Sequence, residues 1–210
     1  MPACVRTVGQ PRAADRVVVI GASLGGLAAL SIVLSGLPAA LPAAVLVVQH
    51  LSAQVGSRLS DILDLRCALP VRTARGGETL LPGCVFVAPS ARHLLIGGSG
   101  KLALSDAAPD RFVRPSANLL FQSAAMCIGA GTIAVVLTGR GDDGTRGVLA
   151  VKRAGGTVIA QDAASSTAFG MPGAAIASGC ADFVLPLVSI APKIRSLVGQ
   201  QLGPRGAAGA

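Results

Sequence analysis

Four residues of the chain have the types and the placement that acyl-transfer chemistry needs. Ser23 lies in the turn "GASLG", His50 follows the apolar run "AVLVV" and one glutamine, and Asp142 and Asp143 follow "TIAVVLTG" and two more residues. A serine hydroxyl becomes a nucleophile when an imidazole takes its proton, and a carboxylate orients that imidazole and stabilises its charged form. The chain therefore contains the parts of a Ser–His–Asp triad, although α/β-hydrolases have the order Ser–Asp–His.

The turn around Ser23 has two other interpretations. The stretch "VVVIGASLGGLAAL" has some features of a dinucleotide-binding turn. That turn needs glycine at position 23 and an acidic residue about twenty positions later, and no acid occurs near Ala43. Ser23 could instead act only as a helix cap, which would make the chain a catalytically idle α/β binding module. Asp142 and Asp143 could each cap the following helix, and residue types alone do not choose between them.

Apolar, β-branched runs alternate with helical segments along most of the chain. Strands are predicted at Val17–Ile20, Ala44–Val48, Ile133–Leu137, 157–162 and Phe183–Leu185, and an extended segment is predicted to begin at Val71. Helices are predicted at Leu27–Leu34, Gln54–Leu65, Ala117–Cys127, 142–155, Pro172–Ala177 and Ser189–Val198. This alternation is typical of an α/β fold with a doubly wound, mostly parallel sheet and helices on both faces. Working sites of such sheets lie beyond the carboxyl ends of the strands, where the four residues above are found.

The segment Leu81–Asp106 has a different pattern. Short β runs in "LPGCVFVAPSARHLLIGGSGKLALSD" are separated by P-G, P-S and G-G-S-G, which is typical of antiparallel hairpins. We expect this antiparallel hairpin region at the edge of the main sheet. His93 lies inside it and is expected to be a structural or rim histidine.

Composition excludes several classes of function. The 210 residues are 51% hydrophobic and 13% charged with a net charge of +8, which favours a folded domain with acidic partners. The absence of Trp and Tyr argues against nucleic acid, and five scattered cysteines with two histidines predict neither a metal site nor a cofactor. Glycines and prolines interrupt the uncharged stretch Val17–Ser57, so we expect no membrane insertion and, without an export signal, a cytoplasmic location.

Six motifs occur together and in a specific order. They are "IGASLGG", "VVQH", "LPGCVFVAPSARH", "RPSANLLF", "LTGRGDDGTRG" and "QDAASSTAFGMP". In this combination the chain resembles the catalytic domain of chemotaxis-receptor (protein-glutamate) methylesterases, the CheB-type family. The resemblance implies three parts, namely a short N-terminal extension at 1–16, the catalytic domain at 17–198 and a flexible tail at 199–210.

The resemblance implies a serine esterase that acts in chemotaxis adaptation or a related signalling pathway. Its substrates would be glutamate γ-methyl esters on the acidic, Glu-rich helices of a methylated chemoreceptor, with release of methanol and with deamidation of particular glutamines. A serine hydrolase acting on a different methylated protein is the alternative within this chemistry. Family members usually carry a receiver domain that inhibits them, so a separate regulatory receiver protein is expected as a partner here.

The resemblance also assigns roles to single residues. Ser23 would be the nucleophile, His50 the base and Asp143 the carboxylate. Leu24 and Arg140 would lie at the oxyanion and substrate site, where the Arg140 backbone N–H is a candidate donor. Leu24 replaces a threonine common in the family, which removes a hydroxyl but keeps a backbone N–H. In "RPSAN", an asparagine replaces the usual acid, a change expected to alter substrate binding.

Overall fold

A seven-stranded sheet forms the centre of the structure, a computed structural model that describes residues 14–50 and 58–200. All neighbouring strands of this sheet are parallel. Their order is β3 (Val71–Thr73), β4 (Val85–Val87), β2 (Ala44–Gln49), β1 (Val17–Ala22), β7 (Thr132–Val136), β8 (Thr157–Gln161) and β9 (Phe183–Leu185). The chain places β2, the edge strand β3 and then β4 on one side of β1, and it then returns to the other side of β1 with β7, so the strand order reverses at β1.

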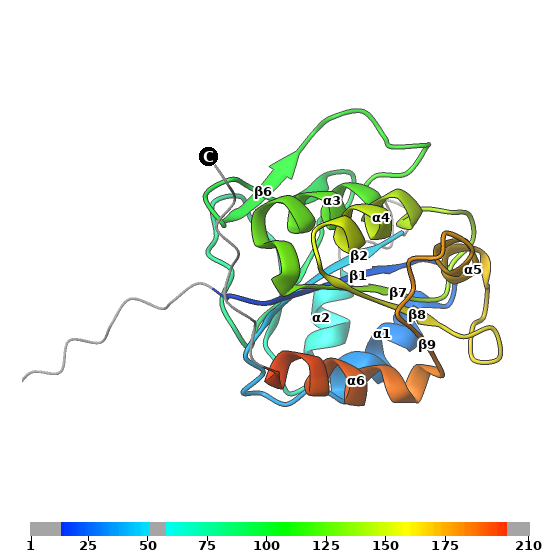
Figure 1. Cartoon of the computed structure of the whole chain (residues 1–210). Coiled ribbons are helices and arrows are strands. Elements are labelled where there is room, and N and C mark those ends of the chain that lie inside the picture. Colours follow the sequence, from blue (N-terminus) through cyan, green and yellow to red (C-terminus); the bar gives the residue numbers. More distant parts are fainter. Residues whose placement is uncertain (1–13, 51–57, 201–210) are drawn as a thin grey trace, which may run out of the picture.

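Helices cover both faces of the sheet (Figure 1). One face carries α1 (Gly26–Ser35), α2 (Leu59–Asp64) and α6 (Leu187–Gly199), and the other carries α3 (Ala117–Ile128), α4 (Thr145–Arg153) and α5 (Gly170–Ala177). A single 3₁₀ turn (Gly129–Gly131) joins α3 to β7. The predicted doubly wound α/β fold is confirmed.

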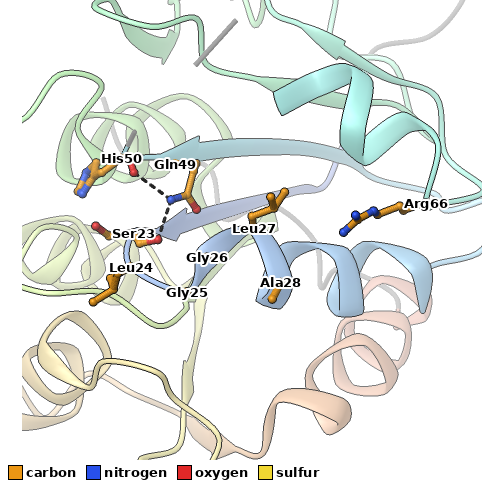
Figure 2. A pocket seen from close by; sticks show the side chains of 9 residues that line it. All are labelled: Ser23, Leu24, Gly25, Gly26, Leu27, Ala28, Gln49, His50 and Arg66. Atoms are coloured by element: carbon orange, nitrogen blue, oxygen red, sulfur yellow. Dashed lines mark hydrogen bonds between the residues drawn. The ribbon is translucent and has the colours of Figure 1, made fainter. Parts of the chain in front are cut away.

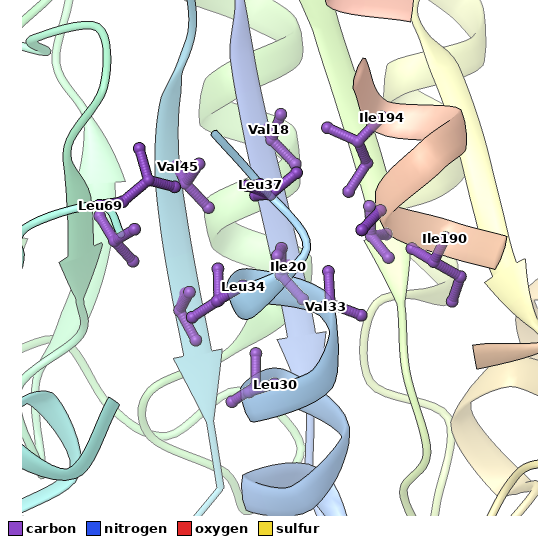
Figure 3. Packing of buried hydrophobic residues seen from close by; sticks show 14 of the residues in the cluster. Val18, Ile20, Leu30, Val33, Leu34, Leu37, Val45, Leu69, Ile190 and Ile194 are labelled. Carbon is purple, nitrogen blue, oxygen red and sulfur yellow. The ribbon is translucent and has the colours of Figure 1, made fainter. Parts of the chain in front are cut away.

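Successive residues of the central strands belong to different cores because side chains alternate along a strand. Val18 and Ile20 of β1 belong to the core under α1 and α6, whereas Val17 and Val19 belong to the core under α3 and α4. Figure 3 shows the first core, in which Leu30 of α1 lies against the sheet. All six residues of β1 are buried, which explains its uniformly apolar sequence.

The region Leu81–Asp106 is only partly the predicted antiparallel hairpin. Its strands β5 (His93–Ile96) and β6 (Leu102–Ser105) pair antiparallel and form a separate two-stranded sheet. Val85–Val87, however, is a parallel strand of the main sheet between β2 and β3, so the antiparallel prediction is wrong for these three residues. The motif "VFV" carries too little pattern to show its partners, which are chosen by burial between two neighbouring strands.

The remaining predicted elements occur close to their expected positions. Val17–Ile20 and Ala44–Val48 pair in one sheet as expected, whereas the helix predicted at Gln54–Leu65 is observed at Leu59–Asp64. Residues 54–57 of that prediction, and most of the predicted N-terminal extension and tail, lie outside the described residues. Within the described ranges, no helix has both the length and the apolar character needed to cross a membrane.

Candidate active site

Ser23 and His50 lie beside each other because the strands before them pair in register. Ala22 of β1 is the partner of Gln49 of β2, and the N–H of His50 donates to the carbonyl oxygen of Ala22 at 3.0 Å. The next residue of each strand therefore leaves the sheet at the same edge. Both side chains line one groove with a volume of about 570 Å³, and Figure 2 shows them together at the strand ends.

The imidazole of His50 is held by one of the two candidate aspartates. Its Nε2 atom lies 2.8 Å from Oδ2 of Asp143, and the two side chains are only 15% and 8% exposed. An ionised carboxylate can only accept hydrogen bonds, so Nε2 carries the proton and Nδ1 keeps a free lone pair. Within the described part of the chain, neither Nδ1 nor the Ser23 hydroxyl has a hydrogen-bond partner. Nucleophile–base contacts are often loose until a substrate is present.

Asp143 accepts hydrogen bonds from several groups besides the imidazole. Backbone N–H groups of Ala117 and Asn118, in the first turn of α3, donate to it at 2.6 and 3.0 Å. The hydroxyl of Ser116 lies 2.9 Å from its Oδ1 atom. Burial alone would raise the pKa of Asp143, but the bonds from His50, Asn118 and Ala117 outweigh burial and lower the pKa below its usual value. Asp143 therefore stays ionised at neutral pH.

The lowered pKa of Asp143 gives an expectation about stability at acid pH. A carboxyl whose pKa is lower in the folded than in the unfolded state stabilises the fold above its unfolded pKa, about 3.9, and loses that contribution as pH falls through the folded value. Asp143→Asn should therefore lower the free energy of unfolding most at pH 7 and progressively less below about pH 4. Urea unfolding of both proteins at pH 7, 5 and 3.5 measures this, and a pH-independent difference would contradict it.

Asp142 has a different environment from its neighbour. Its side chain is about half exposed and forms a surface ion pair with Arg111, Nη1 to Oδ2, at 2.6 Å. It makes no contact with the imidazole among the interactions of the described residues. The structure therefore distinguishes two adjacent aspartates that residue types alone treat as equivalent.

Gln49 connects the ends of β1 and β2, a role that is not evident from the sequence alone. Its Nε2 atom donates to the carbonyl oxygens of Ser23 at 2.7 Å and of His50 at 3.0 Å (Figure 2). A Cβ atom on Gly26 would collide with Oε1 of this amide, so only glycine fits there. Gly25, with φ of 80°, supplies the left-handed conformation between the Ser23 turn and α1. The motif "VVQH" was the available signal for Gln49.

Leu24 and Arg140, the other two predicted site residues, each line a depression that His50 also lines. Leu24 lines the large groove with Ser23, and among the described residues its backbone N–H has no acceptor. Arg140 is exposed and lines a smaller hollow of about 80 Å³ together with His50 and Asp143. Both predicted residues are therefore near the imidazole, in separate depressions of the surface.

Asn118, the last residue of "RPSAN", stands where the family usually has an acid. It is buried next to Asp143, to which its backbone N–H donates. Its Oδ1 atom accepts the N–H groups of Gly144 and Gly147 at the start of α4, both at 3.0 Å. Its Nδ2 atom donates to Oδ2 of Asp110 at 3.2 Å, which a carboxylate could not do. The amide therefore joins α3, α4 and the loop that contains Asp110.

His93 is fully buried and lies outside the groove. Its Nδ1 atom accepts the N–H of Ser116 at 3.2 Å, so Nε2 carries the proton and donates to the carbonyl oxygen of Ala108 at 3.2 Å. These contacts fit the structural role that the sequence predicts. Within residues 14–50 and 58–200, no three His, Cys, Asp or Glu side chains gather in a way that could hold a metal ion.

Because His93 is buried outside the groove, we expect a substitution there to lower stability but to leave activity nearly unchanged. His93→Gln should keep kcat within a few-fold of wild type, because no atom of His93 reaches the groove. It should lower the free energy of unfolding by about 1–3 kcal/mol, because a buried hydrogen-bonded group is replaced imperfectly. Denaturant unfolding and ester-hydrolysis rates of the variant measure the two effects. Loss of activity without loss of stability would show that His93 belongs to the catalytic machinery.

Comparisons with known proteins agree on one family. The sequence model of a family described as CheB methylesterase matches residues 18–194. A protein-glutamate methylesterase/protein-glutamine glutaminase 3 of Anaeromyxobacter dehalogenans is 48% identical over 180 residues, which are 85% of this chain and 53% of that protein. A protein-glutamate methylesterase/protein-glutamine glutaminase of Moorella thermoacetica is 45% identical over 186 residues, 87% of this chain and 44% of that protein. The chain thus spans about half the length of the curated relatives it matches.

A solved structure has the same fold. The crystal structure of the Thermotoga maritima CheB methylesterase catalytic domain superposes with a TM-score of 0.84 and 40% sequence identity. The match covers 87% of this chain and 98% of that one. The similarity therefore extends over a complete catalytic domain.

Proposed function

The chain belongs to the CheB methylesterase family, and from this premise we propose that it is a serine esterase that hydrolyses γ-methyl esters of protein glutamates. The observation that carries the proposal is the 2.8 Å contact between Nε2 of His50 and Asp143, which leaves Nδ1 as a base in the groove that contains Ser23. The idle binding module is disfavoured because a helix cap at Ser23 would need neither this imidazole nor a buried carboxylate behind it. The α1 N-terminus also has no side-chain cap.

The proposed reaction has two stages. Nδ1 of His50 takes the Ser23 proton as Oγ attacks the ester carbonyl, and the resulting imidazolium is stabilised by Asp143. The C–OCH₃ bond then breaks, and the proton passes from the imidazolium to the leaving oxygen, which releases methanol. Water, deprotonated by the same nitrogen, then attacks the acyl carbon, the bond from that carbon to Ser23 Oγ breaks, and the imidazolium returns its proton to Oγ, which leaves a glutamate carboxylate on the substrate.

Backbone N–H groups are the proposed donors to the oxyanion. The N–H of Leu24 follows the nucleophile directly and has no acceptor among the described residues, so it is available when negative charge develops. The N–H of Arg140 is the proposed second donor. Because Leu24 acts through its backbone in this proposal, the loss of the family threonine leaves this function intact.

The proposed substrate is a methylated receptor with acidic, Glu-rich helices. The net charge of +8 supports this assignment, since a basic protein attracts acidic partners. A glutamine side chain would react in the same way with ammonia as the leaving group, so deamidation is part of the proposal. The cytoplasmic location expected from the sequence and the regulatory receiver protein implied by the resemblance stay predictions.

Methanol release is the direct test of this function. The purified protein is incubated with a Glu-rich helical peptide that carries one γ-methyl ester, and methanol is measured against time. Stoichiometric methanol and new carboxylate are expected, and a glutamine-containing peptide tests for ammonia. Hydrolysis of a small neutral methyl ester without hydrolysis of the peptide would favour a serine hydrolase with a different substrate. Absence of turnover on all esters, with no labelling of Ser23 by a serine-directed reagent, would support the idle module.

A further inference from the structure

The groove that begins at Ser23 continues along α1 and ends at a positive charge. Its lining consists of Ser23, Leu24, Gly25, Gly26, Leu27, Ala28, Gln49, His50 and Arg66. Apart from the imidazole, Arg66 is the only ionisable residue among these nine. Figure 2 shows the Arg66 side chain pointing back along α1 toward Leu27. Arg66 lies in none of the six motifs, so the sequence alone indicates no role for it.

Arg66 follows α2, and a neutral hydroxyl holds its side chain in place. Its Nη1 atom donates to the Ser31 hydroxyl at 3.1 Å, and that hydroxyl donates to the carbonyl oxygen of Leu27 at 2.8 Å. Asp64, close by in sequence, accepts the N–H of Val71 instead. Among the interactions of the described residues, Arg66 has no carboxylate partner. Its guanidinium therefore keeps donors available for an anion in the groove.

Arg140 also has no carboxylate partner among the interactions of the described residues, but it lines the separate smaller hollow rather than this groove. Two further arginines near the site are paired with carboxylates. Arg111 pairs with Asp142, and Arg146 pairs with Asp110. Among the described residues that line the groove, Arg66 is thus the one permanent cation, and it is partly oriented before any ligand arrives. A guanidinium is the side chain best matched to a carboxylate, because its planar fork can donate two parallel hydrogen bonds.

The separation between Arg66 and Ser23 sets how far from the reacting ester a substrate carboxylate must lie to contact Arg66. α1 begins at Gly26, directly after the Ser23 turn, and Ser31 lies in its second turn. At about 1.5 Å per residue, Ser31 lies roughly 7.5 Å along α1 from Gly26, and the Ser23 turn precedes Gly26. The guanidinium bound to Ser31 is therefore on the order of 10 Å from the reacting centre. Two turns of a helical substrate cover roughly the same distance, so residues seven apart on one face would reach both points.

We propose that Arg66 is a substrate-specificity residue that binds a carboxylate lying about two helical turns from the reacting ester. The groove would then select methyl esters embedded in acidic helical sequence over isolated esters. This inference rests on the proposed function and specifies its substrate. Arg66 contacts no reacting atom in this role, so its contribution belongs to KM rather than to kcat.

Designed peptides test the proposal. Alanine-based helical peptides carry one γ-methyl-glutamate and one glutamate placed three, four or seven residues away on either side, each matched by a peptide with glutamine instead. For the peptide whose glutamate lies seven residues from the ester, Arg66→Gln is expected to raise KM about fivefold with kcat unchanged. A factor of this size corresponds to the interaction free energy of a favourable exposed ion pair. For the glutamine peptides the same substitution should change nothing. Arg66→Lys and Ser31→Ala should each raise KM for that glutamate peptide less than Arg66→Gln does.

Arg153→Gln is the matched control, since it removes the same charge from an exposed position at the end of α4, outside the groove. Equal increases in KM for both variants, or increases that do not depend on the position of the glutamate, would mean general charge attraction and overturn the role of Arg66. Normal methanol release with unchanged KM in Arg66→Gln would overturn this inference alone. No methanol from any peptide with the wild-type protein would overturn both the inference and the proposed function.

Discussion

Ser23→Ala is expected to lower kcat for methyl-ester hydrolysis by a factor on the order of a million. Removal of a triad nucleophile has that effect because the remaining residues cannot form the acyl-enzyme. The fold should be unaffected, since the Ser23 hydroxyl makes no hydrogen bond to a described residue and the Ser23 backbone bonds to Thr138, Gly26 and Gln49 remain possible for alanine. Methanol release under saturating substrate measures the effect, together with the free energy of unfolding, expected to change by less than about 0.5 kcal/mol.

Ser35→Ala is a matched control for the nucleophile variant. Ser35 is the exposed last residue of α1, and its hydroxyl donates only to the carbonyl oxygen of Ile32. This variant should retain full activity. If Ser23→Ala kept even a tenth of the wild-type rate, Ser23 would not be the nucleophile and the proposed mechanism would be wrong.

Asp143→Asn is expected to lower kcat by about ten-thousandfold, as the corresponding change does in a known triad. Oδ2 of Asp143 accepts from the imidazole and from the Ala117 N–H, whereas Oδ1 accepts from the Asn118 N–H, so the NH₂ group of an amide would face either the imidazole together with the Ala117 N–H, or the Asn118 N–H. Facing the imidazole, it would favour the tautomer with the proton on Nδ1, the atom needed as a base. Rates should be measured well below the midpoint of thermal unfolding, because the same substitution removes hydrogen bonds of α3.

The neighbouring aspartate is the control for this prediction. Asp142→Asn removes only an exposed ion pair with Arg111, so kcat should remain within about twofold and stability within about 1 kcal/mol. Circular dichroism of both variants separates chemical effects from unfolding. Equal, modest losses of kcat in the two variants would mean that neither aspartate completes a triad.

Much of the fold was accessible from the sequence because the strands are buried on both faces. Runs such as Val17–Ile20 and Ala44–Val48 are apolar throughout, and parallel order places the residues that follow them at one edge. That rule alone brought Ser23 and His50 together. It could not separate Asp142 from Asp143, because the direction of each side chain depends on the loop after β7 and on the α3 turn that donates to Asp143.

Other parts of the site depend on contacts that no local pattern records. Arg66 comes from the end of α2 and reaches the groove only because α2 lies close to α1. The role of Gln49 depends on the absence of a side chain at Gly26, which lies on another element. The position of β4 depends on two strand partners rather than on its own three residues. Tertiary packing decides each of these features.

The pairing of His50 with Asp143 also has a consequence for how activity appears during folding. These residues are 93 positions apart in the chain, and they meet only when β7 has docked against β1. Such non-local pairing is slow, because the loop-closure entropy is lost before the contacts form. A partly folded chain with β1, β2 and α1 in place would hold Ser23 and His50 but no oriented imidazole. Recovery of esterase turnover after dilution from denaturant would therefore report the docking of the two halves of the sheet, later than the return of helical circular dichroism.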